Sequence, residues 1–254
     1  MPEPTGPDPQ DEAEGTDWQR RVVGRSLRAA TQRSIDRGSS LIQAAATLLE
    51  RSNGDGFTVQ DVADEAGQSL RTLYQYFESK DDLLLAVFEE AQRTYARMIE
   101  RSLVELSDPL ERLGGGIVAA LRMPEFSETG VDRGLSRLRA KLAAVEPALI
   151  ARSQEPVTML MRGLIHDAEA AEAIHTDDPE GTTYLVLALK SAFITSATLG
   201  NDFGAEAPSV PALVSFVLRG VGVSVDLDWI EDVSGRLRMP KRRSAQVVLI
   251  DTAE

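Results

Sequence analysis

Six arginines between positions 18 and 37 are the residues whose type and spacing most clearly suggest chemistry. The only acid among them is Asp36, so the segment has a net charge of +5. Guanidinium groups bind phosphates, and this attraction acts over about 8 Å at physiological salt. We predict that this basic arm contacts DNA through Arg33 and Arg37; the alternative is a solvated charged tail. The six arginines are Arg20, Arg21, Arg25, Arg28, Arg33 and Arg37.

The net charge of the whole chain, −13, does not exclude nucleic acid. Residues 1–17 contain six acids and no base, and residues 81–254 contain 27 acids and 18 bases. The segment between them is net positive, because it contains nine bases and seven acids. Since screening makes phosphate attraction local, a basic region binds DNA even when the rest of the chain is acidic.

Motifs of enzymatic chemistry are missing from the sequence. It has no Gly-x-Ser-x-Gly elbow, no Walker loop and no His-Glu-x-x-His pair. It has no cysteine, and its two histidines, His166 and His175, are too far apart for a metal pair at i, i+4. The glycine run 114–116 follows no predicted strand, so it is a poor phosphate loop. We expect no enzyme, no metal site and no cofactor.

Apolar residues at helical spacing predict an all-α protein. The first clear helix follows Gly38, with Ser39 or Ser40 as its cap, and ends at the turn residues 53–56. Residues 1–37 are expected to form a disordered acidic leader and the basic arm, because the first 16 hold four prolines among acids and glycines. The buried stripe of this first helix comprises Leu41, Ala44, Ala45, Leu48 and Leu49.

Residues 59–76 have the layout of a helix-turn-helix. Thr58 is a predicted cap for one helix, with Asp61 three residues on, as in a capping box. Gly67 permits the turn into a second helix that runs from about Ser69 to Tyr76. The alternative is an ordinary three-helix packing unit. Ser79 caps a long fourth helix, and further helices are predicted at 109–122, 131–144, 147–174, 179–199 and 209–222.

Residues 57–84 resemble the signature of the TetR/AcrR regulators. The most specific matches are Thr72-Leu73-Tyr74, Tyr76-Phe77, Lys80 and Leu83-Leu84. Gln68 departs from the aliphatic residue usual in the family, and Tyr76 stands where histidine is common. The resemblance implies a helix-turn-helix DNA-binding domain at 38–84 and a helical ligand-binding and dimerisation domain at 85–235. Residues 236–254 would then be a C-terminal tail.

The resemblance also implies roles for individual residues. Leu70, Arg71 and Thr72 would face base edges, and Arg71 is the best candidate for bidentate recognition of guanine. Leu70 has the alternative of completing the core, Arg71 of reaching only a phosphate, and the tyrosines of packing. Phosphate contacts are expected from Thr58, Ser69, Tyr74, Tyr76 and Lys80, and Gln75 completes the DNA-contacting set.

Two apolar segments, 184–199 and 210–223, suggest helices that are buried on most faces. The resemblance implies that they pair with their copies in a four-helix dimer interface; the alternative is that they form only the monomer core. A ligand pocket is implied in the same way, and apolar side chains of adaptable shape could line it. The candidates are Met98, Met123, Phe126, Met159, Met161, Tyr184 and Phe193.

Together these features predict a repressor that binds palindromic double-stranded DNA as a homodimer and is released by a small apolar ligand. The alternative is a helix-turn-helix protein controlled by a protein partner or by its own concentration. We expect a cytoplasmic protein without a membrane anchor, because Lys190 divides the longest apolar run and the N-terminus lacks the pattern of a signal peptide.

Overall fold

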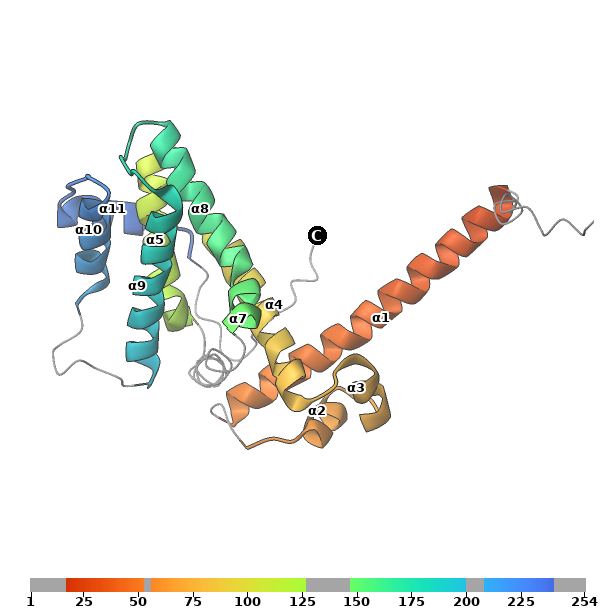
Figure 1. Cartoon of the computed structure of the whole chain (residues 1–254). Coiled ribbons are helices and arrows are strands. Elements are labelled where there is room, and N and C mark those ends of the chain that lie inside the picture. Colours follow the sequence, from red (N-terminus) through yellow and green to blue (C-terminus); the bar gives the residue numbers. More distant parts are fainter. Residues whose placement is uncertain (1–16, 53–55, 127–146, 200–207, 240–254) are drawn as a thin grey trace, which may run out of the picture. The chain divides into compact units, whose positions relative to one another are not determined.

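The computed structural model describes residues 17–52, 56–126, 147–199 and 208–239, and no strand occurs in these ranges (Figure 1). The predicted all-α class is therefore confirmed. The helix expected at 131–144 lies outside the described residues. Within the described ranges, no helix is long and apolar enough to cross a membrane. The chain divides into two units, residues 1–40 and residues 41–254, which are described separately.

The first helix is longer than the sequence indicated. It is α1, Asp17–Arg51, with 35 residues. A start after Gly38 is wrong, because Ser39 and Ser40 both lie inside this helix, which also includes the basic arm from Asp17 onward. Arginine, alanine, glutamine and leucine favour helix, and this outweighs the cost of about 1 kcal/mol for each internal glycine.

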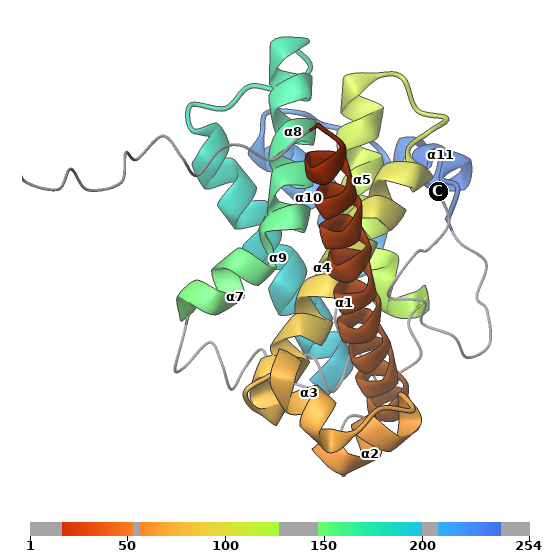
Figure 2. The same cartoon turned by 90° about the vertical axis from the view of Figure 1, so that its right-hand side faces the viewer.

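A helix-turn-helix domain follows within the second unit. It consists of the end of α1, then α2 (Val59–Glu65), α3 (Leu70–Tyr76) and the beginning of α4 (Lys80–Ser102). Figure 2 shows α2 and α3 at one end of α4. One apolar core holds these helices together. Its fully buried members are Leu41, Ala45, Ala46, Val62, Ala63, Leu73, Leu83, Val87 and Ala91.

The helical body is built around α5 (Pro109–Phe126). This helix packs against α4 and against four others, namely α8 (Glu155–Ala170), α9 (Pro179–Leu199), α10 (Val210–Gly220) and α11 (Leu227–Arg236). The predicted helix 147–174 is divided into α7 (Pro147–Ser153) and α8. Pro156 explains the division, because it lacks the N–H that would bond to the carbonyl of Arg152.

The glycine run in α5 serves close packing. A Cβ added at Gly116 would lie 2.5 Å from Leu164 Cδ1, and one at Gly114 would lie 2.9 Å from the Trp229 ring. A Cβ at Gly115 would lie 2.7 Å from Leu106 Cδ1. Since real Cβ atoms do not approach so closely, three glycines in a row let neighbouring side chains reach the α5 backbone.

The C-terminal helix α11 was not predicted. Asp226 caps it by accepting a hydrogen bond from Trp229 N (2.8 Å), and Ile230 and Val233 are fully buried. Leu237 is buried too, and the backbone N–H of Arg238 donates to the carbonyl of Ser102 (3.0 Å). The packed domain therefore extends past the boundary predicted at residue 235.

Candidate nucleic-acid interface

The first helix of the motif, α2, begins with the predicted capping box. The Thr58 hydroxyl accepts a hydrogen bond from Asp61 N (3.2 Å), and Asp61 Oδ2 accepts from Thr58 N (2.7 Å). The Thr58 hydroxyl also donates to Asp61 Oδ2 (2.8 Å). These bonds, the backbone one above all, lower the pKa of Asp61, and the positive charge of Lys80 acts in the same direction. The carboxylate form thus fixes the start of α2.

The turn between α2 and α3 is closed by backbone hydrogen bonds. Gly67 has φ of +62°, a conformation that side chains with a Cβ rarely adopt. The following residue, Gln68, donates its N–H to the carbonyl of Ala63 (2.8 Å). Because this turn leaves little freedom between the two helices, the orientation of α3 is set by the packing of α2.

The second helix, α3, is anchored at its start and on its inner side. The Ser69 hydroxyl accepts a hydrogen bond from Thr72 N (3.0 Å), and the two hydroxyls lie 2.8 Å apart. Leu73 is fully buried and Phe77, which follows the helix, is 9% exposed. The polar atoms of Ser69 and Thr72 thus already have partners within the protein.

The outer side of α3 presents three polar side chains. Arg71, Tyr74 and Gln75 are exposed and lie at i, i+3 and i+4, so they share one face of the helix. Of the residues expected to face bases, Leu70 and Thr72 are half-buried instead. Arg71 and Gln75 are therefore the side chains of α3 best placed to reach base edges.

Lys80 has partners inside the domain. Its ammonium group donates a hydrogen bond to the carbonyl of Phe57 and lies 4.1 Å from the centre of the Phe57 ring. This contact joins the first residue of α4 to the segment before α2. Tyr76, another expected phosphate contact, is half-buried against the same core. Thr58 is exposed, with its hydroxyl engaged in the capping box.

Two residues connect the domain to the body, and of these Ile150 was not singled out from the sequence. Ile150 of α7 is 7% exposed and belongs to the core of the helix-turn-helix domain. Tyr95 of α4 packs against both that core and the core of the body. The apolar character of Ile150 was visible in the sequence, but nothing in the pattern indicated which core it would join.

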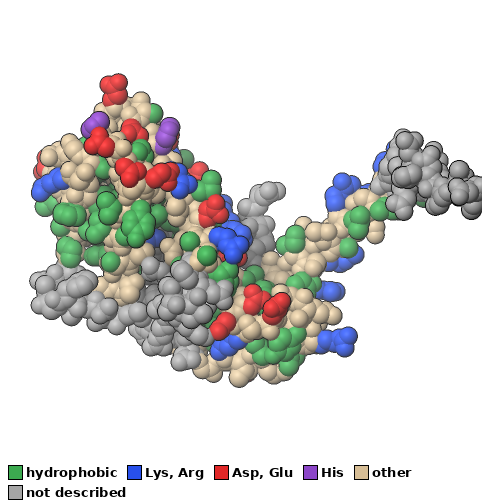
Figure 3. Space-filling view, viewed as in Figure 1, with side chains coloured by type: hydrophobic (Ala, Val, Ile, Leu, Met, Phe, Trp, Pro, Cys, Tyr) green, Lys and Arg blue, Asp and Glu red, His purple; other side chains and the backbone are tan. Residues whose placement is uncertain are grey.

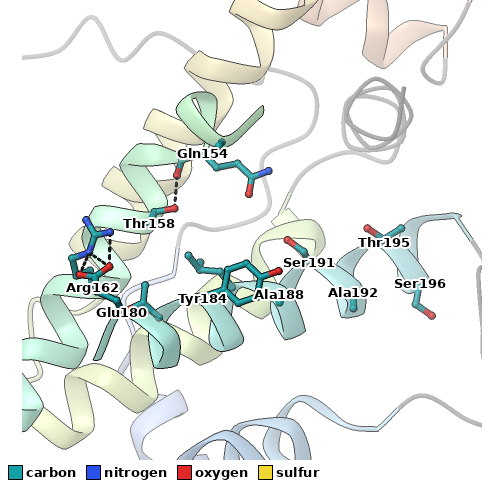
Figure 4. A pocket seen from close by; sticks show the side chains of 13 residues that line it. Gln154, Thr158, Arg162, Glu180, Tyr184, Ala188, Ser191, Ala192, Thr195 and Ser196 are labelled. Atoms are coloured by element: carbon teal, nitrogen blue, oxygen red, sulfur yellow. Dashed lines mark hydrogen bonds and ion pairs between the residues drawn. The ribbon is translucent and has the colours of Figure 1, made fainter. Parts of the chain in front are cut away.

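Among the candidate ligand residues whose side chains the structure describes, Tyr184 and Met159 line two different hollows. Tyr184 lines an open groove of about 700 Å³ between α8 and α9, in which Arg162 forms an ion pair with Glu180 (2.8 Å; Figure 4). Met159 lines a separate hollow of about 410 Å³ beside α4. Met98 and Phe193 pack against the core of the body, and Met161 is buried in it. The side chains of Met123 and Phe126 lie outside the described residues.

The two histidines, His166 and His175, are both exposed, and His175 Nε2 lies 3.6 Å from Asp177 Oδ1. In the part of the chain that the structure describes, no three histidine, cysteine or acidic side chains cluster as a metal site would require.

Large apolar side chains are exposed on α9 and α10. Tyr184 and Leu185 of α9 are 72% and 62% exposed, and Phe216 of α10 is 64% exposed. Figure 3 shows hydrophobic side chains gathered on the face of the body formed by these two helices. Both helices were predicted from the sequence, and each also buries a side against the rest of the body.

Sequence comparison agrees with this geometry. The profile of the bacterial regulatory proteins of the tetR family matches residues 41–87. An uncharacterized HTH-type transcriptional regulator of Mycobacterium tuberculosis is 31% identical over 109 residues, which are 43% of this chain and 49% of that protein. The regulator HbdR of an Aromatoleum strain is 35% identical over 78 residues, 31% of this chain and 34% of HbdR. The chain thus spans about half the length of these relatives, or less.

Solved structures extend the likeness in fold to the body. RolR, in a crystal structure with its ligand resorcinol, is similar with a TM-score of 0.61 and 19% identity over 84% of this chain and 100% of that chain. The fatty acid degradation regulator FadR from Bacillus halodurans has a TM-score of 0.54 and 19% identity over 73% of this chain and 94% of its own. At such identities the likeness concerns the fold alone.

The tight turn, the exposed polar face of α3 and the all-helical body define a helix-turn-helix domain followed by a helical body. The helix-turn-helix domain is similar to that of the bacterial regulatory proteins of the tetR family, and the relatives that match part of the chain are HTH-type transcriptional regulators.

Proposed function

We propose that the protein is a transcription repressor that binds a palindromic DNA operator as a homodimer and is released by a small ligand. The exposed face of α3 carries this proposal. Arg71, Tyr74 and Gln75 project from a helix that Leu73 and a closed turn hold in one orientation. A rigid helix of this kind fits the major groove, where arginine and glutamine form bidentate hydrogen bonds with guanine and adenine.

The exposed apolar residues of α9 and α10 support the homodimer. Tyr184, Leu185 and Phe216 present to solvent the kind of large side chains that protein interfaces cover. A two-fold dimer would set two copies of α3 about one turn of DNA apart, roughly 34–36 Å. The operator is therefore expected to be an imperfect palindrome.

Helix α4 supports control by a ligand. Its first half packs in the core of the helix-turn-helix domain and its second half in the core of the body, with Tyr95 packing against both. A ligand that favours one position of α4 would change DNA affinity by its preference for that state. Resorcinol, the ligand of RolR, indicates small phenols as first compounds to test.

The test of the function is selection of DNA by the full chain from a random duplex library, followed by footprinting of the selected sequence. We expect a protected region with dyad symmetry and about two copies of the protein per duplex. A protein that selects no sequence, or protects a site without dyad symmetry, would contradict the proposal.

Ligand control is tested separately. Calorimetry with small phenols and with apolar carboxylic acids compares binding to the free protein and to the protein–operator complex. Release requires tighter binding to the free protein, because coupling between two sites is reciprocal. Equal affinity for both forms of every compound that binds would contradict ligand release and favour the alternative, control by a protein partner or by concentration.

A further inference from the structure

The first unit of the structure places three of the six arginines of the basic arm in one row. Between Asp17 and Ser40 the chain is continuously helical. Helical spacing places Arg21, Arg25 and Arg28 at i, i+4 and i+7, hence on one face. Arg33 and Arg37, the residues predicted from the sequence, fall on a different face of the same helix.

All three arginines of this row are exposed. The one acid between residues 18 and 37, Asp36, accepts a hydrogen bond from Gln32 (2.8 Å). Like charges at i, i+4 destabilise a helix, so the row weakens α1 unless an anion lies beside it. The row is therefore a feature that a polyanion would stabilise.

We propose that residues 17–40 form a second DNA-binding element, in which Arg21, Arg25 and Arg28 bind phosphates of the operator duplex. This inference rests on the proposed function. A rise of 1.5 Å per residue distributes the three arginines over about 10 Å of helix. One DNA strand carries a phosphate every 3.4 Å along its axis, so about three phosphates lie within the same length.

The apolar residues of this helix favour DNA over the other partners of basic helices. At 100° per residue, the pair Trp18 and Val22 points about 140° away from the pair Val23 and Leu27. Ile35 lies on a third side, and all five side chains are exposed. A membrane surface requires one continuous apolar face. A second copy of the helix would bring together two segments of the same positive charge.

The experiment measures operator affinity of the full chain by fluorescence anisotropy between about 50 and 300 mM salt. The test variant combines Arg21→Gln, Arg25→Gln and Arg28→Gln. A first control replaces the same residues by lysine, which retains the charge. A second control removes three exposed arginines from α4 and α7 through Arg93→Gln, Arg101→Gln and Arg152→Gln, with the same change in net charge. Circular dichroism and thermal unfolding verify that each variant is folded.

We expect the slope of log affinity against log salt to fall in the glutamine variant by about 0.9 for each phosphate that it no longer binds. For a dimer, in which each of the two copies loses three arginines, the slope would fall by up to about 5. Both controls should retain the slope of the parent protein. The footprint should retain its sequence, because α3 is unchanged.

A glutamine variant with the slope of the parent protein overturns this inference and leaves the proposed function intact. A fall of the same size in the α4 and α7 control also overturns it, because the effect would then follow from net charge. A parent protein that selects no DNA contradicts the proposed function itself. In that case, the parent protein and the glutamine variant are tested for binding to phosphatidylserine vesicles. Binding by the parent protein that is lost in the glutamine variant would assign the row to a membrane surface instead.

Discussion

Arg71 and Gln75 lie one helical turn apart on the exposed face of α3, and their side chains differ in which base they can recognise. An arginine that is bidentate to guanine discriminates against other bases by about 1–3 kcal/mol. We predict that Arg71→Ala loses this amount on the selected operator and tolerates any base at one position of each half-site. Binding measurements on a set of single-base operator variants check this.

Tyr74→Phe is the matched control for Arg71→Ala, since it alters the same face without removing a base contact. It should weaken binding to all operator variants by a similar factor. If Arg71→Ala shows that uniform pattern as well, the arginine contacts a phosphate and does not read a base.

Lys80 contributes to stability through its contacts with Phe57. Replacing it by methionine removes both the hydrogen bond to the carbonyl and the charge over the ring. We predict that Lys80→Met lowers the free energy of unfolding by about 1–2 kcal/mol, measured by urea denaturation. Unchanged stability together with a reduced salt slope of DNA binding would instead assign Lys80 to a phosphate, as the family resemblance implied.

Asp61 makes the helix-turn-helix domain sensitive to acid. Its pKa is lowered from 3.8 by the hydrogen bonds from Thr58. The folded state therefore binds the proton less tightly than the unfolded chain does. The stabilisation is fully present above the unfolded value and is lost as the pH falls through the lower folded pKa.

We predict that the melting temperature falls further for the parent protein than for Asp61→Asn when the pH is lowered from about 5 to about 2, because asparagine does not titrate in this range. The measurement is thermal unfolding of both proteins across that range. Parallel curves would mean that the Asp61 carboxylate has the same pKa in the folded and unfolded states.

At the scale of elements, two glycines provide a matched test of packing around α5. Gly116→Ala places a methyl group 2.5 Å from Leu164 Cδ1, whereas a Cβ at Gly163 in α8 meets nothing within 4 Å. We predict that Gly116→Ala destabilises the protein by about 1–3 kcal/mol, because overpacking forces neighbours to move. Gly163→Ala should stabilise it by about 0.5–1 kcal/mol through helix propensity. Similar unfolding energies for both variants would refute the packing role of the run.

The short helices of the DNA-binding motif could be predicted closely because their ends are chemical signals. Thr58 and Ser79 cap α2 and α4 as expected, Ser69 caps α3 at the place where this helix was expected to begin, and Gly67 adopts the positive φ that the turn requires. Each of these signals involves residues within about four positions of one another, so the amino-acid sequence alone is enough to identify it. The exposure of individual α3 residues was harder to predict, because the half-burial of Leu70 and Thr72 depends on how the helix packs in the fold.

Elements stabilised by distant contacts could not be read in this way. Helix α11 is short, and it is held by Ile230, Val233 and the ion pair from Arg236 to Glu111, 125 positions away. The start of α1 was missed because residues 17–37 lack a regular apolar stripe, and helices are predicted from sequence mainly by such a stripe. Which side chains would line a ligand cavity depends on packing between helices that are separated in sequence.

At the scale of the whole molecule, the exposed apolar residues of α9 and α10 predict where the proposed homodimer would form. Phe216→Asp should convert the protein to a monomer at micromolar concentration, because burying an unpaired carboxylate costs several kcal/mol. Sedimentation velocity measures the outcome. Val104→Asp is the control, since Val104 is 73% exposed at the end of α4 and outside both helices. A dimer that survives Phe216→Asp would place the interface elsewhere.

Helix α4, with its 23 residues, acts as a lever. At 1.5 Å per residue it is about 34 Å long. If the end in the body is tilted by about 5°, the end that carries the helix-turn-helix domain moves by roughly 3 Å, nearly the 3.4 Å between adjacent base pairs. In a two-fold dimer the displacement occurs twice, in opposite directions. In the proposed dimer, a tilt of a few degrees in the body would thus be enough to put the two copies of α3 out of step with the operator.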